Sequence, residues 1–174
     1  LVLINGAYGK RIAAMLDYLG RDYVVIDTGN YEPPRGPAVT EALAADPAIT
    51  DVIVVHCETS TGILNPIAEI SRAVYDADRR LFIDSMSAFG AVRFDFAKCG
   101  IDFMASSANK CIEGVPGFSL VICRRDSLQA TQGWARSVSL DLLAQWQGLE
   151  ANGQFRFTPP THVALALEQA LSEL

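Results

Sequence analysis

The hydrophobic residues of this chain follow two spacings, one typical of buried strands and one typical of helices. The strand-like segments are short, continuous apolar runs that end in polar residues, glycine or proline. They lie at residues 1–4, 23–27, 51–57, 80–84, 101–106 and 118–123. Only a tight link rich in glycine and proline precedes the last run, so we expect this run to turn back against its neighbour.

Between these runs, apolar residues recur every three or four positions, as on the buried face of a helix. The predicted helices cover residues 10–19, 39–46, 66–77, 139–147 and 163–171. The expected buried stripe of the first helix is Ile12, Met15, Leu16 and Leu19. Strands that alternate with helices predict an α/β fold, a three-layer sandwich with a mostly parallel sheet.

Composition and charge narrow the function classes. The chain has 174 residues, half of them hydrophobic and one fifth charged, with a net charge of −6. No basic run, membrane-length apolar stretch or signal-peptide pattern is present, and the four cysteines form no C-x-x-C pair. We therefore predict a cytoplasmic protein with reduced cysteines, no metal site, and no nucleic-acid or membrane partner.

The two ends of the chain lie inside predicted elements. The sequence starts without methionine on an apolar run and finishes within the helical pattern of residues 162–174. Its length suits one domain. We interpret residues 1–174 as a single domain from a longer protein, incomplete at both ends.

Polar side chains follow three of the predicted strands, where ligands bind in open α/β sheets. Residues 51–57 lead into the hydroxyl-rich segment 58–62, residues 80–84 end on Asp84, and residues 101–106 are followed by Lys110. We expect a hydroxyl cluster, a carboxylate and an amine to meet at one edge of the sheet.

Lys110 and Asp84 together suggest a chemistry that neither residue suggests alone. Lys110 lies among small residues and would stand in a partly desolvated pocket, which favours the free amine that attacks an aldehyde. Taken singly, Lys110 can be a surface lysine and Asp84 a turn former. A pyridoxal cofactor needs both an amine and a carboxylate, on neighbouring strand ends, and the 26-residue spacing fits one strand–connection–strand unit.

Three further residues have both a functional and a structural interpretation. The hydroxyl of Thr59 can contact a cofactor ring or satisfy a turn. Tyr8 can stack on a ring or fill the core. Thr158 stands at an expected helix N-cap with Pro159 in the first turn, which suits a phosphate but also suits an ordinary cap.

Three strings in the sequence resemble a known family. The segments HCETSTGILNP (56–66), FIDSMSAFG (82–90) and SSANKCIEGVPGFSLVI (106–122) are similar to the class V aminotransferases, which are fold type I enzymes dependent on pyridoxal 5'-phosphate. The similarity extends over essentially the whole chain. It implies the large, cofactor-binding domain of such an enzyme, with Lys110 as the residue that binds the cofactor aldehyde and Asp84 as the partner of the pyridine nitrogen.

The resemblance implies further roles. Thr59 would contact the cofactor ring, Tyr8 would stack on it, and Asn109 would lie near the phosphate. Thr158 would reach the cofactor of the neighbouring subunit in a homodimer. The phosphate loop of the family would precede Leu1, and the small domain would follow Leu174.

The resemblance also implies an activity, the transfer of an amino group from a small-molecule donor to a keto acid. Within the family, the strings are most similar to the enzymes that act on 2-aminoethylphosphonate and pyruvate and yield phosphonoacetaldehyde and alanine. Three alternatives remain open: an alanine–glyoxylate or serine–pyruvate type of aminotransferase, a piece that folds without binding cofactor, and a non-catalytic binding module.

Overall fold

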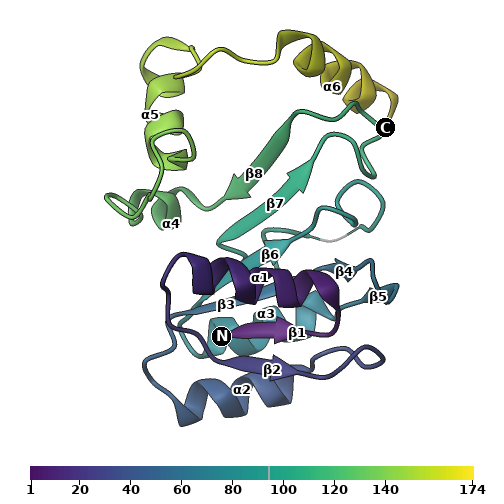
Figure 1. Cartoon of the computed structure of the whole chain (residues 1–174), viewed down its shortest axis with the longest axis vertical. Coiled ribbons are helices and arrows are strands. Elements are labelled where there is room, and N and C mark those ends of the chain that lie inside the picture. Colours follow the sequence, from purple (N-terminus) through teal and green to yellow (C-terminus); the bar gives the residue numbers. More distant parts are fainter. Residues whose placement is uncertain (94) are drawn as a thin grey trace.

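A six-stranded sheet organises the chain (Figure 1). The computed structural model describes residues 1–93 and 95–174. The sheet has the order β2-β1-β3-β6-β7-β8, and every neighbouring pair is parallel except β7 with β8. Its strands are β1 (Val2–Ile4), β2 (Val25–Asp27), β3 (Asp51–Val55), β6 (Arg80–Asp84), β7 (Phe103–Ser107) and β8 (Ser119–Cys123). The predicted α/β fold, the mostly parallel sheet and the returning last strand are confirmed.

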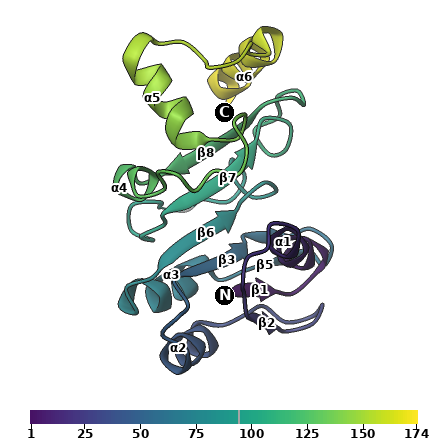
Figure 2. The ribbon, with the colours of Figure 1, turned by 60° about the vertical axis from the view of Figure 1, so that its left-hand side comes forward.

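Helices cover both faces of this sheet. Figure 2 shows α1 (Ala7–Tyr18) on one side, and α2 (Gly36–Ala45) and α3 (Ile67–Asp76) on the other. The C-terminal part of the chain adds α4 (Arg125–Gln129), α5 (Leu142–Asn152) and α6 (Thr161–Glu173) around β7 and β8. Among the described residues, no helix has the length and apolar character needed to cross a membrane.

The alternation of side chains along β6 and β7 determines which residues share a face. Leu81, Ile83 and Met104 belong to the core cluster that contains residues of α2 and α3. Phe82 and Phe103 point to the opposite face, where their rings stack with centroids 4.7 Å apart and pack against α4 and α5. Since successive strand residues alternate between faces, Asp84, Ala105 and Ser107 lie on this second face, which is also the face of α1.

The structure corrects two details of the predicted helices. In α1, Gly9 and Ala13 are buried and Ile12 and Leu16 are partly buried, whereas Met15 and Leu19 of the expected stripe are 54% and 47% exposed. Small residues let α1 approach the sheet closely, and a pattern of large apolar residues does not reveal this. The helix α4 and the hairpin β4 (Cys57–Glu58) with β5 (Ile63–Leu64) were not predicted, because such short elements have too few residues for a period.

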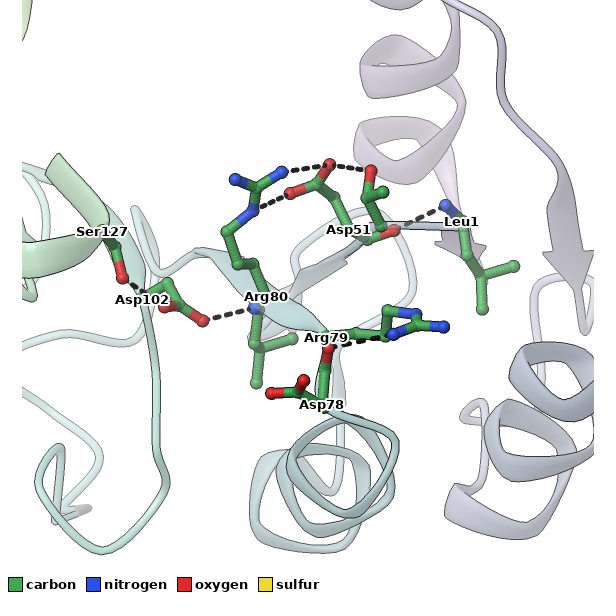
Figure 3. Close-up of polar contacts among 9 residues, drawn as sticks. Leu1, Asp51, Asp78, Arg79, Arg80, Asp102 and Ser127 are labelled. Atoms are coloured by element: carbon green, nitrogen blue, oxygen red, sulfur yellow. Dashed lines mark hydrogen bonds and ion pairs between the residues drawn. The ribbon is translucent and has the colours of Figure 1, made fainter. Parts of the chain in front are cut away.

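Polar contacts hold the edge of the sheet where the strands begin (Figure 3). Arg80 donates to Asp51 with Nε 2.6 Å from Oδ1, across the β3–β6 pair. Asp102, which is 7% exposed, accepts the amide of Leu81 at 2.8 Å and the hydroxyl of Ser127 at 2.5 Å. These contacts lie at the start of β3 and β6, opposite to the strand end that carries Asp84.

We predict that Asp102→Ala lowers the free energy of unfolding by about 2 kcal/mol, because the buried amide of Leu81 and the hydroxyl of Ser127 lose their acceptor. Urea unfolding would measure the loss. Asp22→Ala is the control, because Asp22 is exposed and its removal should not change the transition midpoint. Equal midpoints for Asp102→Ala and the unsubstituted chain would contradict the assignment.

Candidate functional site

The carboxyl ends of β3, β6 and β7 lie side by side, as the sequence predicted. Val55, the last residue of β3, pairs with Asp84, and Asp84 pairs with Ala105 of β7. Lys110 follows three positions after Ser107, the last residue of β7. The backbone therefore brings Asp84 and the Lys110 loop to neighbouring positions at one edge of the sheet.

Asp84 is half-buried, and the burial of its charge is only partly offset by neighbouring groups. Its Oδ1 accepts the amide of Met86 at 3.0 Å. Burial raises the pKa of the Asp84 carboxyl above its ordinary value; the Met86 amide opposes this rise, the charge of Glu58 adds to it, and the charge of Arg11 opposes it. A cationic group placed against Asp84 would relieve this cost.

Two buried polar residues fix the backbone at Asp84. The amide of His56 donates to the Asp84 carbonyl at 2.7 Å, and His56 Nδ1 lies 2.9 Å from Ser85 Oγ. Burial lowers the pKa of His56, so the ring favours its neutral form. His56, the residue that follows β3, thus anchors the strand end that carries Asp84.

Glu58 was given no role from the sequence, yet it is fully buried beside this site. Its carboxylate accepts the backbone amides of Tyr8 and Gly9, in the first turn of α1, at 3.1–3.2 Å. It also accepts the hydroxyl of Ser60 at 2.6 Å. Glu58 therefore ties α1 to the hairpin that follows β3. A buried carboxylate of this kind cannot be distinguished from a solvated one in a single sequence.

Tyr8 is half-buried, and its ring contacts a cation. The guanidinium carbon of Arg11 lies 4.9 Å from the ring centroid. Arg11 is also one of the charges that act on Asp84. Tyr8 and Arg11 therefore lie near Asp84. The side chain of Tyr8 is only partly buried, and the guanidinium of Arg11 lies over its ring.

Thr59 lies in the exposed turn of the hairpin. Its hydroxyl donates to Ser87 Oγ at 3.3 Å, and Ser87 Oγ donates to the carbonyl of Cys57 at 2.8 Å. These bonds connect the turn to the loop that leaves β6. Thr59 is thus bonded directly to Ser87, three residues after Asp84, and Thr59 itself is exposed.

The expected desolvated pocket around Lys110 is not found in this chain, because Lys110 and Asn109 are both exposed. The sequence shows the small neighbours of Lys110 but not which tertiary elements cover it.

The loop that carries Lys110 is nevertheless tightly built. The Gly114 amide donates to the Ala108 carbonyl at 2.7 Å, and a Cβ at position 114 would stand 2.8 Å from that oxygen. Ala108 and Ile112 are buried against α6. The position of Lys110 is therefore defined by backbone geometry, although its side chain reaches solvent.

Thr158 lies away from its expected place. The N-cap of α6 is Pro160, and Thr158 belongs to the exposed segment before it. The prediction of an N-cap threonine with Pro159 in the first turn is wrong, because two successive prolines delay the helix start to Thr161.

Ser107 is a further residue that the sequence did not single out. Its hydroxyl oxygen is buried and has no hydrogen-bond partner among the described residues. It shares the face of Asp84, since both residues occupy the same side of the pleat. An unpaired buried hydroxyl is costly and marks a place where a bound group would supply the missing bond.

Comparisons with known proteins give the family. The model of the family described as aminotransferase class-V matches residues 26–174. The chain belongs to the class-V aminotransferases.

Curated relatives of this class-V aminotransferase chain include a 2-aminoethylphosphonate–pyruvate transaminase of Rhizobium meliloti, 60% identical over 171 residues and covering 98% of the chain. A protein of the same name from Vibrio cholerae is 51% identical over 175 residues and covers 100% of the chain. The chain spans 45% and 48% of the lengths of these two relatives, somewhat less than half.

Solved structures confirm the fold of this class-V aminotransferase chain. Pyridoxamine–pyruvate aminotransferase of Mesorhizobium loti superimposes with a TM-score of 0.85 at 26% identity, over 98% of this chain and 45% of that one. Alanine–glyoxylate aminotransferase of Nostoc gives 0.87 at 22% identity, over 99% and 46%. The chain therefore shares its fold with these two aminotransferases over nearly its whole length.

We predict that Asp84→Asn stabilises the unliganded class-V aminotransferase chain near neutral pH. Because its folded pKa is raised, Asp84 contributes stability at acid pH, and this contribution is lost as the pH rises through the folded pKa. Asparagine keeps the acceptor for Met86 without this loss. Urea unfolding at about pH 4 and about pH 7 should show the advantage of the variant growing with pH. An advantage that is absent at both values, or that shrinks as the pH rises, would contradict the burial of this charge.

Proposed function

We propose that the protein is a pyridoxal 5'-phosphate-dependent aminotransferase that transfers the amino group of 2-aminoethylphosphonate to pyruvate. The observation that carries the proposal is the placement of Asp84 and the Lys110 loop on neighbouring strand ends. The substrate pair is supported by relatives of that name at 51–60% identity over nearly the whole chain. The products would be phosphonoacetaldehyde and alanine.

The residues present fit this cofactor. Asp84, whose pKa is raised by burial, suits the cationic pyridine nitrogen, and the unpaired hydroxyl of Ser107 offers a bond on the same face. Thr59 and Tyr8 would hold the ring, and Asn109 would lie near the phosphate. When bound, pyridoxal phosphate supplies an aldehyde that captures amines and a ring that accepts electrons.

Lys110 would act as the base and acid of the reaction. Its Nζ would take the proton from the carbon that bears the substrate amine. It would hold this proton and then donate it on the side of the bound cofactor. A neutral amine is required for this step, and Lys110 is exposed in this chain. Bound cofactor, together with segments that correspond to the rest of the relatives' length, would supply the desolvation.

Asp84 would keep its negative charge next to the ring. The ion pair would offset the burial that raises the pKa of the free carboxyl, and the ring nitrogen would stay protonated. His56 and Met86 would hold the backbone and one oxygen of Asp84 in place during the reaction. A fixed carboxylate loses little energy to reorganisation when charge moves into the ring.

We also propose that the protein forms a homodimer in the cytoplasm. Thr158, which lies in an exposed segment of this chain, would contact the phosphate of the partner subunit's cofactor.

A second candidate is a chain that folds without binding the cofactor. The exposure of both Asn109 and Lys110 favours it, because neither residue is held in a closed pocket. Direct titration with pyridoxal phosphate separates the two candidates.

We predict that borohydride reduction in the presence of pyridoxal phosphate leaves a covalent adduct on Lys110, found by peptide mass mapping. Lys110→Ala should abolish both the adduct and the transaminase activity of the protein at its natural length, since Lys110 follows the strand that pairs with the one carrying Asp84. Lys98→Ala is the control, because Lys98 is exposed and pairs with Asp95. An adduct that persists at the same level in Lys110→Ala would reject the role of Lys110.

We predict that 2-aminoethylphosphonate is the preferred amino donor with pyruvate as acceptor. Initial rates with this donor, alanine and serine, each measured with pyruvate and with glyoxylate, would rank the substrates. A preference for alanine or serine with glyoxylate would replace the proposed substrate pair and retain the aminotransferase chemistry.

A further inference from the structure

Glu58 is a fully buried carboxylate whose hydrogen bonds come from two separate segments. It accepts the amides of Tyr8 and Gly9 from the first turn of α1, and the amide and hydroxyl of Ser60 from the hairpin turn at 3.4 and 2.6 Å. A carboxylate removed from water needs such donors, and a helix N-terminus favours negative charge. Glu58 is therefore the acceptor on which both segments converge.

The helix α1 depends on this contact because it has no side-chain cap of its own and no acidic residue in its first turn. Ser60 extends the arrangement, since its Oγ accepts the amide of Ala7 at 2.9 Å. The first three amides of α1 are thus satisfied by residues of the hairpin turn.

Gly6 makes the close approach possible. A Cβ at position 6 would lie 2.3 Å from Cγ of Glu58, so a larger residue would force Glu58 to move. A glutamate also caps a helix beside a glycine on the other face of the sheet, where Glu69 accepts the amide of Gly36 at 2.8 Å. There a Cβ at position 36 would lie 2.9 Å from Cγ of Glu69. Glu69 lies in α3, on the face of the sheet opposite to Asp84.

We propose that Glu58 is a positioning residue that sets Tyr8 and Thr59, from opposite segments, around the space in front of Asp84. Thr59 is its chain neighbour, and the amide of Tyr8 is its direct partner. One buried carboxylate thereby fixes two of the residues that would hold the cofactor ring. The inference rests on the proposed function, since the space matters only if a ring occupies it.

The test compares Glu58→Gln with Glu69→Gln in the protein at its natural length. Glutamine keeps the shape and one acceptor oxygen, but it removes the charge and replaces the second acceptor oxygen with an NH2 group, which cannot accept a hydrogen bond. Glu58→Gln therefore cannot satisfy the donors of α1 and of Ser60 together. Hydrogen exchange without cofactor should speed up in two regions for Glu58→Gln, residues 7–9 and 60–62. Glu69→Gln should speed up exchange only near residue 36, at the start of α2.

Titration with pyridoxal phosphate then separates positioning from stability alone. We expect Glu58→Gln to weaken binding about fivefold or more, if a free energy the size of a helix cap is withdrawn from the arrangement of Tyr8 and Thr59, and to alter the visible absorbance of the bound cofactor. Glu69→Gln should leave both unchanged. Faster exchange with unaltered affinity and spectrum would mean that Glu58 only caps α1, and this result would overturn the positioning role. Unaltered exchange would overturn the proposal as well.

Two results need a separate interpretation, a Glu58→Gln variant that does not fold and an unsubstituted protein that binds no cofactor. If Glu58→Gln does not fold, Ser60→Ala removes one donor to Glu58 and the acceptor of Ala7, and it should give smaller changes in the same direction. No change for Ser60→Ala would then overturn the proposal. If the unsubstituted protein binds no pyridoxal phosphate, the proposed function fails and the role of Glu58 toward a cofactor falls with it, whereas the exchange data still measure its contact with α1.

Discussion

The parallel pairing of β3, β6 and β7 is the constraint on which the site depends. It aligns Val55, Asp84 and Ala105 across three strands, so the residues after each strand emerge at one edge. The pleat then selects one face of the sheet for Asp84 and Ser107. A register shift of one residue would turn Asp84 toward the apolar cluster of α2 and α3 and remove it from the site. The chemistry of this chain is in that sense a consequence of its strand register.

Two carboxylates near this edge have opposite roles because their surroundings differ. Glu58 is fully buried and is matched by backbone amides and a hydroxyl, so its charge stabilises the fold. Asp84 has one amide on its carboxylate, and burial raises its pKa. The unmatched carboxylate is the one suited to bind a cation, and the matched one organises the backbone around it. Pairs of acidic groups separated by environment in this way are common at functional sites.

The sequence predicts the sheet better than it predicts the site. Continuous apolar runs mark the strands, because strands buried on both faces admit few polar residues. The same reasoning brings Asp84 and Lys110 to adjoining strand ends. Burial of individual polar side chains is set by tertiary packing, and for that reason the exposure of Lys110 and the burial of Glu58 were not foreseen. The start of α6 was misplaced because a threonine before two prolines has the pattern of an N-cap without its geometry.

In the proposed site, Asp84 would receive the cationic nitrogen of the cofactor ring while Lys110 would receive its aldehyde. The decisive measurement is the titration of the Asp84 side-chain carboxyl, followed by carbon NMR with and without pyridoxal phosphate. We expect the pKa of Asp84 to lie above its ordinary value in the free protein and to fall below it when the cofactor is bound. A titration curve for Asp84 that saturating cofactor leaves unchanged would rule out this ion pair.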